Sequence, residues 1–362
     1  MTRMKDILYF MHVPWGWIKQ RPHFLAEGLA KNYKVKVVTE MQYQKADTKN
    51  ETPVSRSLIY RLPFVRFKVI RKLNEYLRKK QIINKIKRSS IVWFTSPHFM
   101  DDIPSNALDG KVVIYDCMDD YLEFPFLKKD EKQKIRNLEN ELYNKSTIIL
   151  SSSNYLKLEL INRYGLKDVY VVNNAIKQLD AIQMHKELPN KYLAYKQCKK
   201  KKIVYIGTIS QWFDFELVNY ILENSDVEIF LFGPNEITLP NIKGLNNMGV
   251  VEHDFIFEIM DNADVLLMPF KINKLIESVN PVKLYEYIYS GKPCIAPFYG
   301  ESSVFADYVY LYNNKEECLN LINTKNLLPL KSRKECSNFC SENTWVNRIE
   351  IINDIIKNNI PK

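Results

Sequence analysis

Short apolar runs alternate with longer amphipathic stretches along most of the chain. Runs of three to six β-branched, aliphatic and aromatic residues predict strands, and periodic apolar positions between them predict helices. The predicted strands are residues 7–10, 35–39, 58–62, 91–95, 112–115, 147–150, 169–172, 203–206, 227–232, 265–268 and 294–296. The predicted helices are residues 22–31, 131–144, 215–223, 255–262 and 281–290. This order predicts α/β architecture built on doubly wound parallel sheets.

The alternation lapses once, in a polar segment that ends in four consecutive lysines. With 362 residues, the chain is longer than one hydrophobic core usually supports. We therefore expect two Rossmann-like domains, at residues 1–176 and 203–342, joined by a linker at residues 177–202. Residues 343–362 predict an amphipathic helix that docks back toward the first domain.

Composition narrows the class of protein further. Apolar residues make up 46% of the chain, as expected of a folded globular protein, and the six cysteines show no zinc-site spacing. The first thirty residues lack the features of a signal peptide, and no apolar run is long enough to span a bilayer. These features favour a cytoplasmic protein with reduced thiols.

The formal net charge of +10 is concentrated in one segment. Residues 56–88 hold twelve Lys or Arg against one acid, Glu75, and their apolar positions recur at helical spacing. Such a helix suits an anionic membrane surface, but its apolar stripe could equally pack within its own domain. No base-reading module is present, so nucleic acid is not expected. The candidate membrane residues are Arg71, Lys72, Arg78, Lys79, Lys80, Lys85 and Lys87.

Residues 278–295, SVNPVKLYEYIYSGKPCI, predict a loop, a helix and a buried strand. Pro281 suits a first helical turn and Gly291 a helix end. In a parallel sheet, a helix that follows a strand presents its N-terminal N–H groups to the ligand crevice, which favours an anion there. The alternative is that Lys283 and Glu286 form an ordinary surface pair.

Several stretches, in order, resemble the GT-B glycosyltransferases that use nucleotide sugars. Residues 279–296 look like the donor-binding helix of GT4-like families, and VYIG (204–207), LFGP (231–234) and DNADVLLMPF (261–270) match neighbouring landmarks. WGWIKQRPHFLAEGLA (15–30), YDCMDDY (115–121) and LSSSNYL (150–156) resemble bacterial cell-surface polysaccharide enzymes of the teichuronic acid type. The resemblance covers nearly the whole chain and implies two domains facing a central cleft.

The resemblance also implies roles for residues of the second domain. Glu286 takes the place of the glutamate that binds the donor ribose, and backbone N–H groups of Val282 and Lys283 would meet the diphosphate. Two departures from the family pattern are Ser278, where a first glutamate is expected, and the lack of Arg or Lys in residues 207–214. Lys283, and then Arg21, are our candidates to neutralise the leaving phosphate. The predicted donor-binding set is Gly16, Arg21, Gly207, Ser278, Val279, Asn280, Val282, Lys283 and Glu286.

The first domain supplies the catalytic candidates Asp116, Asp119 and His98, each placed directly after a predicted strand. No metal and no cofactor are expected; the donor would be a nucleotide-diphosphate sugar, with UDP-sugars first. The resemblance implies transfer with retention to a growing, lipid-linked surface glycan at the inner face of the membrane. Two alternatives stay open: a non-catalytic GT-B subunit that partners an active transferase, and a nucleotide-sugar epimerase of the same fold.

Overall fold

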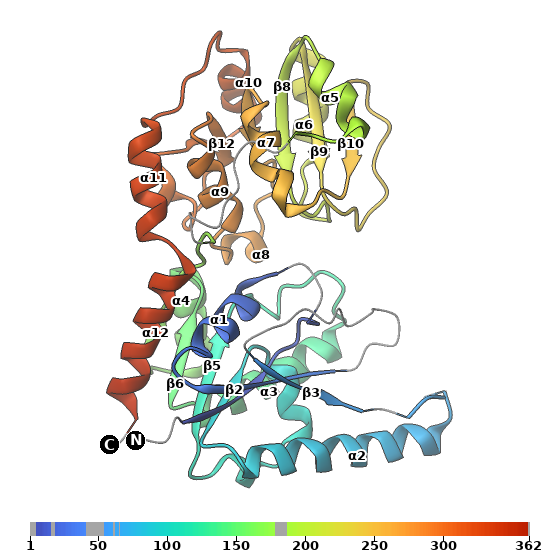
Figure 1. Ribbon diagram of the computed structural model, residues 1–362. Coiled ribbons are helices and arrows are strands. Elements are labelled where there is room, and N and C mark those ends of the chain that lie inside the picture. The colour runs from blue at the N-terminus through green and yellow to red at the C-terminus, as the bar shows by residue number, and fades with distance from the viewer. Residues whose placement is uncertain are drawn as a thin grey trace. The chain divides into compact units, whose positions relative to one another are not determined.

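The computed structural model describes residues 5–15, 19–40, 54–60, 62–64, 66–177 and 187–360. The chain divides into two compact units (Figure 1). The first unit contains the chain up to Asn173 together with the segment from Trp345, and the second contains Asn174–Thr344. The second unit is therefore inserted, in sequence, into the first.

A seven-stranded parallel sheet organises the first unit, with strand order β3-β2-β1-β4-β5-β6-β7. The order reverses between β1 and β4, so the loops after these two strands flank the switch point at which such sheets bind ligands. Its strands are β1 (Asp6–Phe10), β2 (Lys34–Glu40), β3 (Ser55–Ile59), β4 (Ile91–Phe94), β5 (Val112–Cys117), β6 (Ile148–Ser151) and β7 (Val169–Val171). Its helices are α1 (Arg21–Leu29), α2 (Lys68–Lys87), α3 (Lys129–Lys145), α4 (Asn154–Tyr164) and α12 (Trp345–Asn359).

The C-terminal helix α12 completes the first unit by packing against α1. The rings of Phe24 and Trp345 stack with centroids 5.2 Å apart. Gly28 allows the close contact, because a Cβ there would overlap the side chain of Ile349 unless that side chain moved. Buried Ile352 and Ile356 continue the apolar face toward the C-terminus.

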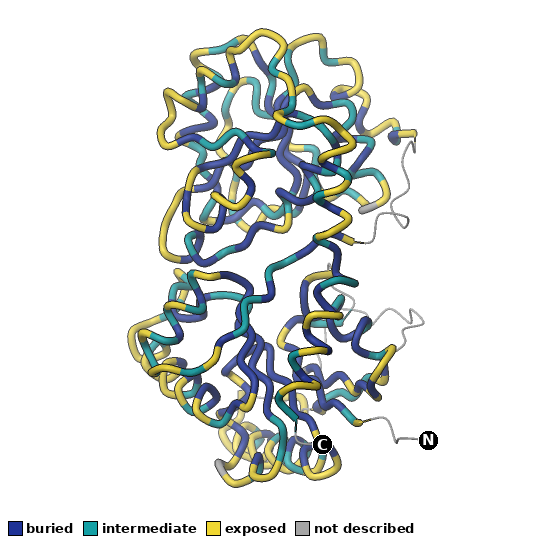
Figure 2. The backbone as a smooth tube through the Cα atoms, turned by 90° about the vertical axis from the view of Figure 1, so that its left-hand side faces the viewer, coloured by how far each residue is buried: buried dark blue, intermediate teal, exposed yellow. Residues whose placement is uncertain are grey.

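A six-stranded parallel sheet organises the second unit, in the order β10-β9-β8-β11-β12-β13. Here the switch point lies between β8 and β11. The strands are β8 (Lys201–Ile206), β9 (Val227–Phe232), β10 (Leu245–Gly249), β11 (Val265–Leu267), β12 (Cys294–Pro297) and β13 (Tyr310–Tyr312). The helices are α5 (Leu193–Gln197), α6 (Phe215–Asn224), α7 (Ile256–Asp261), α8 (Lys274–Glu277), α9 (Val282–Ser290), α10 (Lys315–Asn323) and α11 (Arg333–Glu342). Figure 2 shows buried backbone, in dark blue, in the interior of each unit.

Three sequence expectations need correction. The edge strands β10 and β13 were not predicted, and β3 starts three residues before the predicted strand. The segment predicted as a linker is partly core, because Tyr192 and Tyr195 are fully buried against Phe232 of the second sheet. Residues 178–186 of that segment lie outside the described residues.

The sequence left open whether the apolar stripe of α2 packs within its own unit or faces a membrane. The structure shows packing for the C-terminal half only. The C-terminal half packs on its own unit through buried Ile82 and Ile86. Two of the candidate membrane residues belong to this packing: Arg78 pairs with Asp102 at 2.9 Å, and Lys85 donates to the hydroxyl of Ser57. We therefore remove Arg78 and Lys85 from the candidate membrane set. Within the described residues, no helix is long and apolar enough to cross a membrane.

Candidate functional site

Two glycine turns face each other at the carboxyl ends of β8 and β9. Gly207 donates its N–H to the carbonyl of Phe232 at 2.8 Å, and a Cβ on Gly233 would overlap the Gly207 carbonyl. Both residues have φ near +150°, which favours glycine. The Gly207 turn, packed against the Gly233 turn, therefore leaves backbone without a side chain beside the switch point of the second sheet.

Helix α9 begins beside the Gly207 turn and is held there by its own side chains. The hydroxyl of Tyr287 accepts the N–H of Ile206 at 2.9 Å, which fixes the helix against β8. The hydroxyl of Tyr205 donates to the carbonyl of Thr208 at 2.8 Å and braces the turn. Pro281 is the N-cap and provides no side-chain cap, so the first N–H groups of α9 are available to an anion.

Lys283 lies over the Gly207 turn. A Cβ on Gly207 would overlap the Cε of Lys283, and the Nζ lies 5.8 Å from the ring centroid of Tyr205 and 5.7 Å from that of Phe270. Burial lowers the pKa of Lys283, while the nearby Glu286 carboxylate raises it. The Lys283 ammonium is therefore partly desolvated, and a negatively charged ligand beside it would stabilise its charged form.

The loop before α9 contains an amide donor that the described protein leaves unpaired. Asn280 is 1% exposed and accepts the N–H of Asn174 and the hydroxyl of Tyr285 through Oδ1, at 3.1 and 3.2 Å. Among the described residues its Nδ2 has no hydrogen-bond partner. An unpaired buried donor is costly unless a ligand or water completes it.

The other predicted loop residues are mostly committed to local structure. The hydroxyl of buried Ser278 donates to the carbonyl of Leu275 at 2.7 Å, and the carbonyl of Val279 accepts the hydroxyl of Tyr299. Glu286 is half-buried one turn into α9, and Val282 is exposed at its first residue. The structure thus brings Gly207, Asn280, Lys283 and Glu286 to one edge of the second sheet, whereas Gly16 lies outside the described residues.

In the first unit, an aromatic ring separates two histidines at the switch point between β1 and β4. His12 hydrogen-bonds Thr95 at 2.8 Å, and His98 hydrogen-bonds Ser96 at 2.8 Å. The buried ring of Tyr121 makes edge contacts with both imidazoles, with centroids 5.8 and 5.9 Å apart. Burial, together with the other imidazoles nearby, lowers the pKa of His12, although part of its side chain stays exposed.

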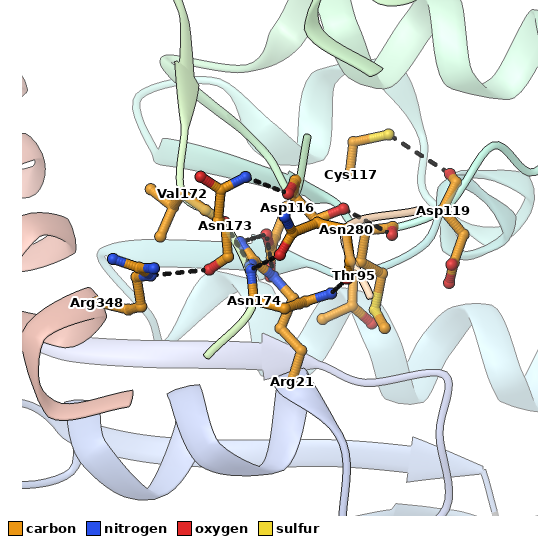
Figure 3. Close-up of polar contacts among 12 residues, drawn as sticks. Arg21, Thr95, Asp116, Cys117, Asp119, Val172, Asn173, Asn174, Asn280 and Arg348 are labelled. Carbon is orange, nitrogen blue, oxygen red and sulfur yellow. Dashed lines mark hydrogen bonds and ion pairs between the residues drawn. The ribbon is translucent and has the colours of Figure 1, made fainter. Parts of the chain in front are cut away.

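Asp116, at the end of β5, and Arg21, at the start of α1, neutralise each other in a buried ion pair (Figure 3). Arg21 donates to both carboxylate oxygens of Asp116, at 2.7 to 3.2 Å, and its other terminal nitrogen donates to the carbonyl of Val172 at 2.6 Å. Both side chains are at most 2% exposed. This buried pair argues against Asp116 as a proton acceptor and against Arg21 as the residue that neutralises a phosphate.

Asp119 is the carboxylate of the acidic loop that keeps acid–base capacity. The pKa of Asp119 is raised to about 7, chiefly by burial and also by the carboxylates of Asp116 and Asp120, while Arg21 acts to lower it. Asp120 is instead held by Arg163, whose Nη1 donates at 2.8 Å. Within the described residues, no group of three or more His, Cys, Asp or Glu side chains is placed to hold a metal ion.

Some site residues escaped the sequence analysis. Gly233 was quoted within a motif but not recognised as the partner of Gly207, because only the strand pairing places the two turns together. Tyr121 and Thr95 were likewise not proposed, since neither residue type signals chemistry by itself. Adjacency of β1, β4 and β5 in the sheet is what brings them to His12 and His98.

The two units form the GT-B fold of glycosyltransferases, as comparison with solved structures shows. The complex of Alr3699/HepE from Anabaena with UDP-glucose covers 98% of this chain and 99% of its own, with a TM-score of 0.72 at 14% identity. Sucrose-phosphate synthase from Thermosynechococcus elongatus covers 98% of both chains, with a TM-score of 0.74 at 9% identity. The doubly wound parallel sheets expected from the sequence are thus confirmed.

In sequence, the chain is similar to TuaH of Bacillus subtilis (strain 168), whose name describes a candidate glycosyltransferase of teichuronic acid biosynthesis. The two are 23% identical over 248 residues, 64% of this chain. The match spans 61% of the length of TuaH. No family model matches the chain.

Proposed function

We propose that this protein is a glycosyltransferase that takes its sugar from a UDP-sugar. The observation that carries the proposal is Lys283 lying over the bare Gly207 turn at the start of α9. A helix N-terminus and a confined lysine together suit a diphosphate. UDP-glucose bound to the GT-B protein HepE supports this class of donor.

Each part of the donor meets a different group in this proposal. The diphosphate lies at the N–H groups of Val282 and Lys283, where the Lys283 ammonium stabilises the charge of the leaving phosphate. The carboxylate of Glu286 accepts hydrogen bonds from the ribose hydroxyls. The sugar lies at Asn280, whose unpaired Nδ2 donates to one of its hydroxyls.

The acceptor is a growing cell-surface glycan, lipid-linked, that the enzyme reaches as a peripheral protein at the inner face of the membrane. Asp119 and His98 orient the acceptor hydroxyl. Asp119 also accepts the proton of this hydroxyl, so it must be ionised. With a pKa of about 7, that role makes the rate fall as the pH drops below neutrality. Transfer proceeds with retention, which needs no enzyme nucleophile, as in the GT4-like enzymes that this chain resembles.

The proposal is tested first by nucleotide binding and then by turnover. Thermal unfolding is measured with UDP, GDP, CDP, ADP and TDP, and UDP should give the largest rise in melting temperature. Labelled UDP-sugars are then assayed for transfer to membrane glycolipid extracts. If no diphosphate raises the melting temperature, or if sugar is transferred only from another nucleotide, the proposal is wrong.

Lys283→Met sharpens this test. We expect the variant to lose at least about tenfold in UDP affinity and about a hundredfold in transfer, since one charge-assisted contact is worth roughly 1.5–3 kcal/mol. Lys292→Met, in the turn after α9 and also half-buried, is the matched control and should behave as wild type. Equal loss in both variants would show that general charge, and not the position over Gly207, controls binding.

A non-catalytic subunit is the second candidate, and Ser278 favours it. Its hydroxyl is committed to Leu275, so it does not replace the acidic group expected at this position. Such a subunit would bind UDP, with neither transfer nor slow donor hydrolysis. Detection of UDP release from a UDP-sugar would exclude this candidate.

A further inference from the structure

Exposed apolar side chains of the described chain are densest in one segment of the first unit. Of nineteen large apolar side chains that are exposed, seven lie between residues 60 and 76. Single exposed apolar residues are ordinary, but a cluster marks an interaction surface. The seven are Tyr60, Leu62, Phe64, Phe67, Val69, Leu73 and Tyr76.

Helix α2 has a second apolar face that points away from its own unit. Val69, Leu73 and Tyr76 follow the spacing i, i+4, i+7 and so share one face. Ile82 lies nine residues after Leu73, which is half a turn round the helix, and it is fully buried. The face that carries Val69, 78% exposed, is therefore not the face that packs on the sheet.

The chain before α2 is held along the helix by two side-chain amides. Asn74 accepts the N–H of Leu62 at 2.7 Å and donates to its carbonyl at 3.0 Å. Gln81 likewise accepts the N–H of Tyr60 at 3.1 Å and donates to its carbonyl at 3.0 Å. Each amide thus satisfies the backbone N–H and C=O of one residue, as a neighbouring strand would. Tyr60 and Leu62 are fixed beside the helix with their side chains exposed.

The turn into α2 also holds an aromatic side chain outward. Phe64 is 62% exposed and has φ +65°, a left-handed conformation that a bulky residue rarely adopts. Its carbonyl accepts the N–H of Phe67 at 3.1 Å, which closes the turn. Unusual backbone at an exposed aromatic is typical of a functional site.

Basic side chains surround the apolar cluster. Lys72, Lys79 and Lys80 flank the exposed face of α2, and the guanidinium of Arg66 lies 5.0 Å from the ring of Phe67. Glu75 is the one acid between residues 60 and 80. The exposed basic residues of this segment within the described chain are Arg66, Lys68, Arg71, Lys72, Lys79 and Lys80.

We propose that these apolar and basic side chains of residues 60–80 form a membrane-docking surface for an anionic lipid bilayer. Aromatic and aliphatic groups enter the boundary between headgroups and acyl chains, while lysine and arginine meet lipid phosphates. A polyanion such as RNA would use the cations but leave the seven apolar side chains in water. The C-terminal half of α2 stays attached to its own unit and anchors the surface.

This inference rests on the membrane association within the proposed function and names the surface responsible, but its test involves no donor or acceptor. Purified protein is sedimented with vesicles of phosphatidylcholine alone and of phosphatidylcholine with phosphatidylglycerol. We expect binding to the anionic vesicles to be stronger by at least about tenfold, and to weaken as salt rises. Absence of vesicle binding would not contradict the proposed transferase activity, and absence of transferase activity would not contradict the proposed docking surface.

Two pairs of variants separate the apolar from the basic contribution. Phe67→Ser with Leu73→Ser, and Lys72→Glu with Lys79→Glu, should each weaken binding to anionic vesicles by about tenfold or more. The matched controls are Leu166→Ser with Leu328→Ser, and Lys129→Glu with Lys325→Glu, all exposed positions elsewhere. The controls should bind as wild type, and all variants should keep their circular dichroism and melting temperature.

Three outcomes would overturn the proposal. The first is a wild-type protein that does not sediment with anionic vesicles. The second is equal binding by the α2 variants and their controls. The third is loss of self-association or of RNA binding in the α2 variants with vesicle binding unchanged, which would assign the surface to a second copy or to a polyanion.

Discussion

At the scale of single residues, the two units keep their charged groups in different ways. In the first unit, Arg21 and Asp116 satisfy each other, so their charges support the fold. In the second, Lys283 lies among rings and a glycine turn, near Glu286. A partly buried charge gains most from an incoming ligand of opposite charge. This contrast favours Lys283 over Arg21 as the phosphate ligand.

Glu286→Ala should abolish transfer and leave the fold intact. The side chain is half-buried on α9, so truncation leaves no large cavity, while under the proposed function the donor ribose would lose its hydrogen bonds to this carboxylate. We expect a loss of at least about a hundredfold in kcat/KM with an unchanged melting temperature. Glu277→Ala, next to the position of the expected first glutamate, is the control. Near-normal turnover by the Glu286 variant would remove it from the site.

Asp119→Asn should stabilise the protein at alkaline pH but not at acidic pH. An unfolded aspartate ionises near pH 4, whereas burial holds the pKa of Asp119 at about 7. Between these values the unfolded state releases a proton that the folded state keeps, so the wild type loses stability as the pH rises, up to about pH 7.

Asparagine lacks this loss. We expect the variant to be more stable than the wild type by roughly 2 kcal/mol at pH 8, allowing for partial exposure, and equally stable near pH 4. Urea unfolding at the two pH values measures the difference, with exposed Asp307→Asn as control. A difference that is the same at both pH values would contradict the raised pKa.

At the scale of secondary-structure elements, the glycine pair at the ends of β8 and β9 is the most constrained feature. Gly233→Ala should destabilise the second unit by about 1–3 kcal/mol, since its φ is +147° and its Cβ would overlap the Gly207 carbonyl. It should also reduce UDP binding, because the Gly207 turn must shift. Gly300→Ala, with open space at its Cβ, is the control in thermal unfolding and UDP titration.

Elements were predictable where the sequence repeats a clear period. Buried strands such as β8 and β9 each end in a run of four apolar residues, and α9 carries both its start and its stop residues. β10, LNNMG, is a half-exposed edge strand without apolar alternation, so no local signal marks it. The donor-binding role of α9 was inferred from the resemblance to GT-B glycosyltransferases and not from a local pattern. The hydrogen bonds of Asn74 and Gln81 to the backbone of residues 62 and 60 depend on a tertiary contact that no local sequence pattern encodes.

At the scale of the whole molecule, the two units differ in how the chain builds them. The second unit is one continuous segment, Asn174–Thr344, with its own hydrophobic core. The first needs both ends of the chain, because α12 covers α1 through Trp345 and Ile349. Sequence periodicity predicted an amphipathic helix at the C-terminus, but only the Gly28 contact explains where it packs.

This difference predicts that the units separate unequally. A fragment of residues 174–344 should fold alone, unfold cooperatively and retain a UDP-induced rise in melting temperature, since this unit has its own hydrophobic core and carries the Gly207 turn and helix α9. A fragment of residues 1–173 should be destabilised by several kcal/mol, because loss of α12 exposes the buried partners of its apolar face.

Adding residues 345–362 as a separate peptide should partly restore the first fragment, and Gly28→Val in the full chain should mimic its loss by blocking Ile349. Urea unfolding of the three samples, with circular dichroism, measures these effects. A 174–344 fragment that stays unfolded would show that the second core depends on the first. A 1–173 fragment as stable as the full chain would show that α12 contributes nothing to the fold. If the 174–344 fragment folds and binds UDP alone while the 1–173 fragment is destabilised, donor binding is a property of the second unit by itself.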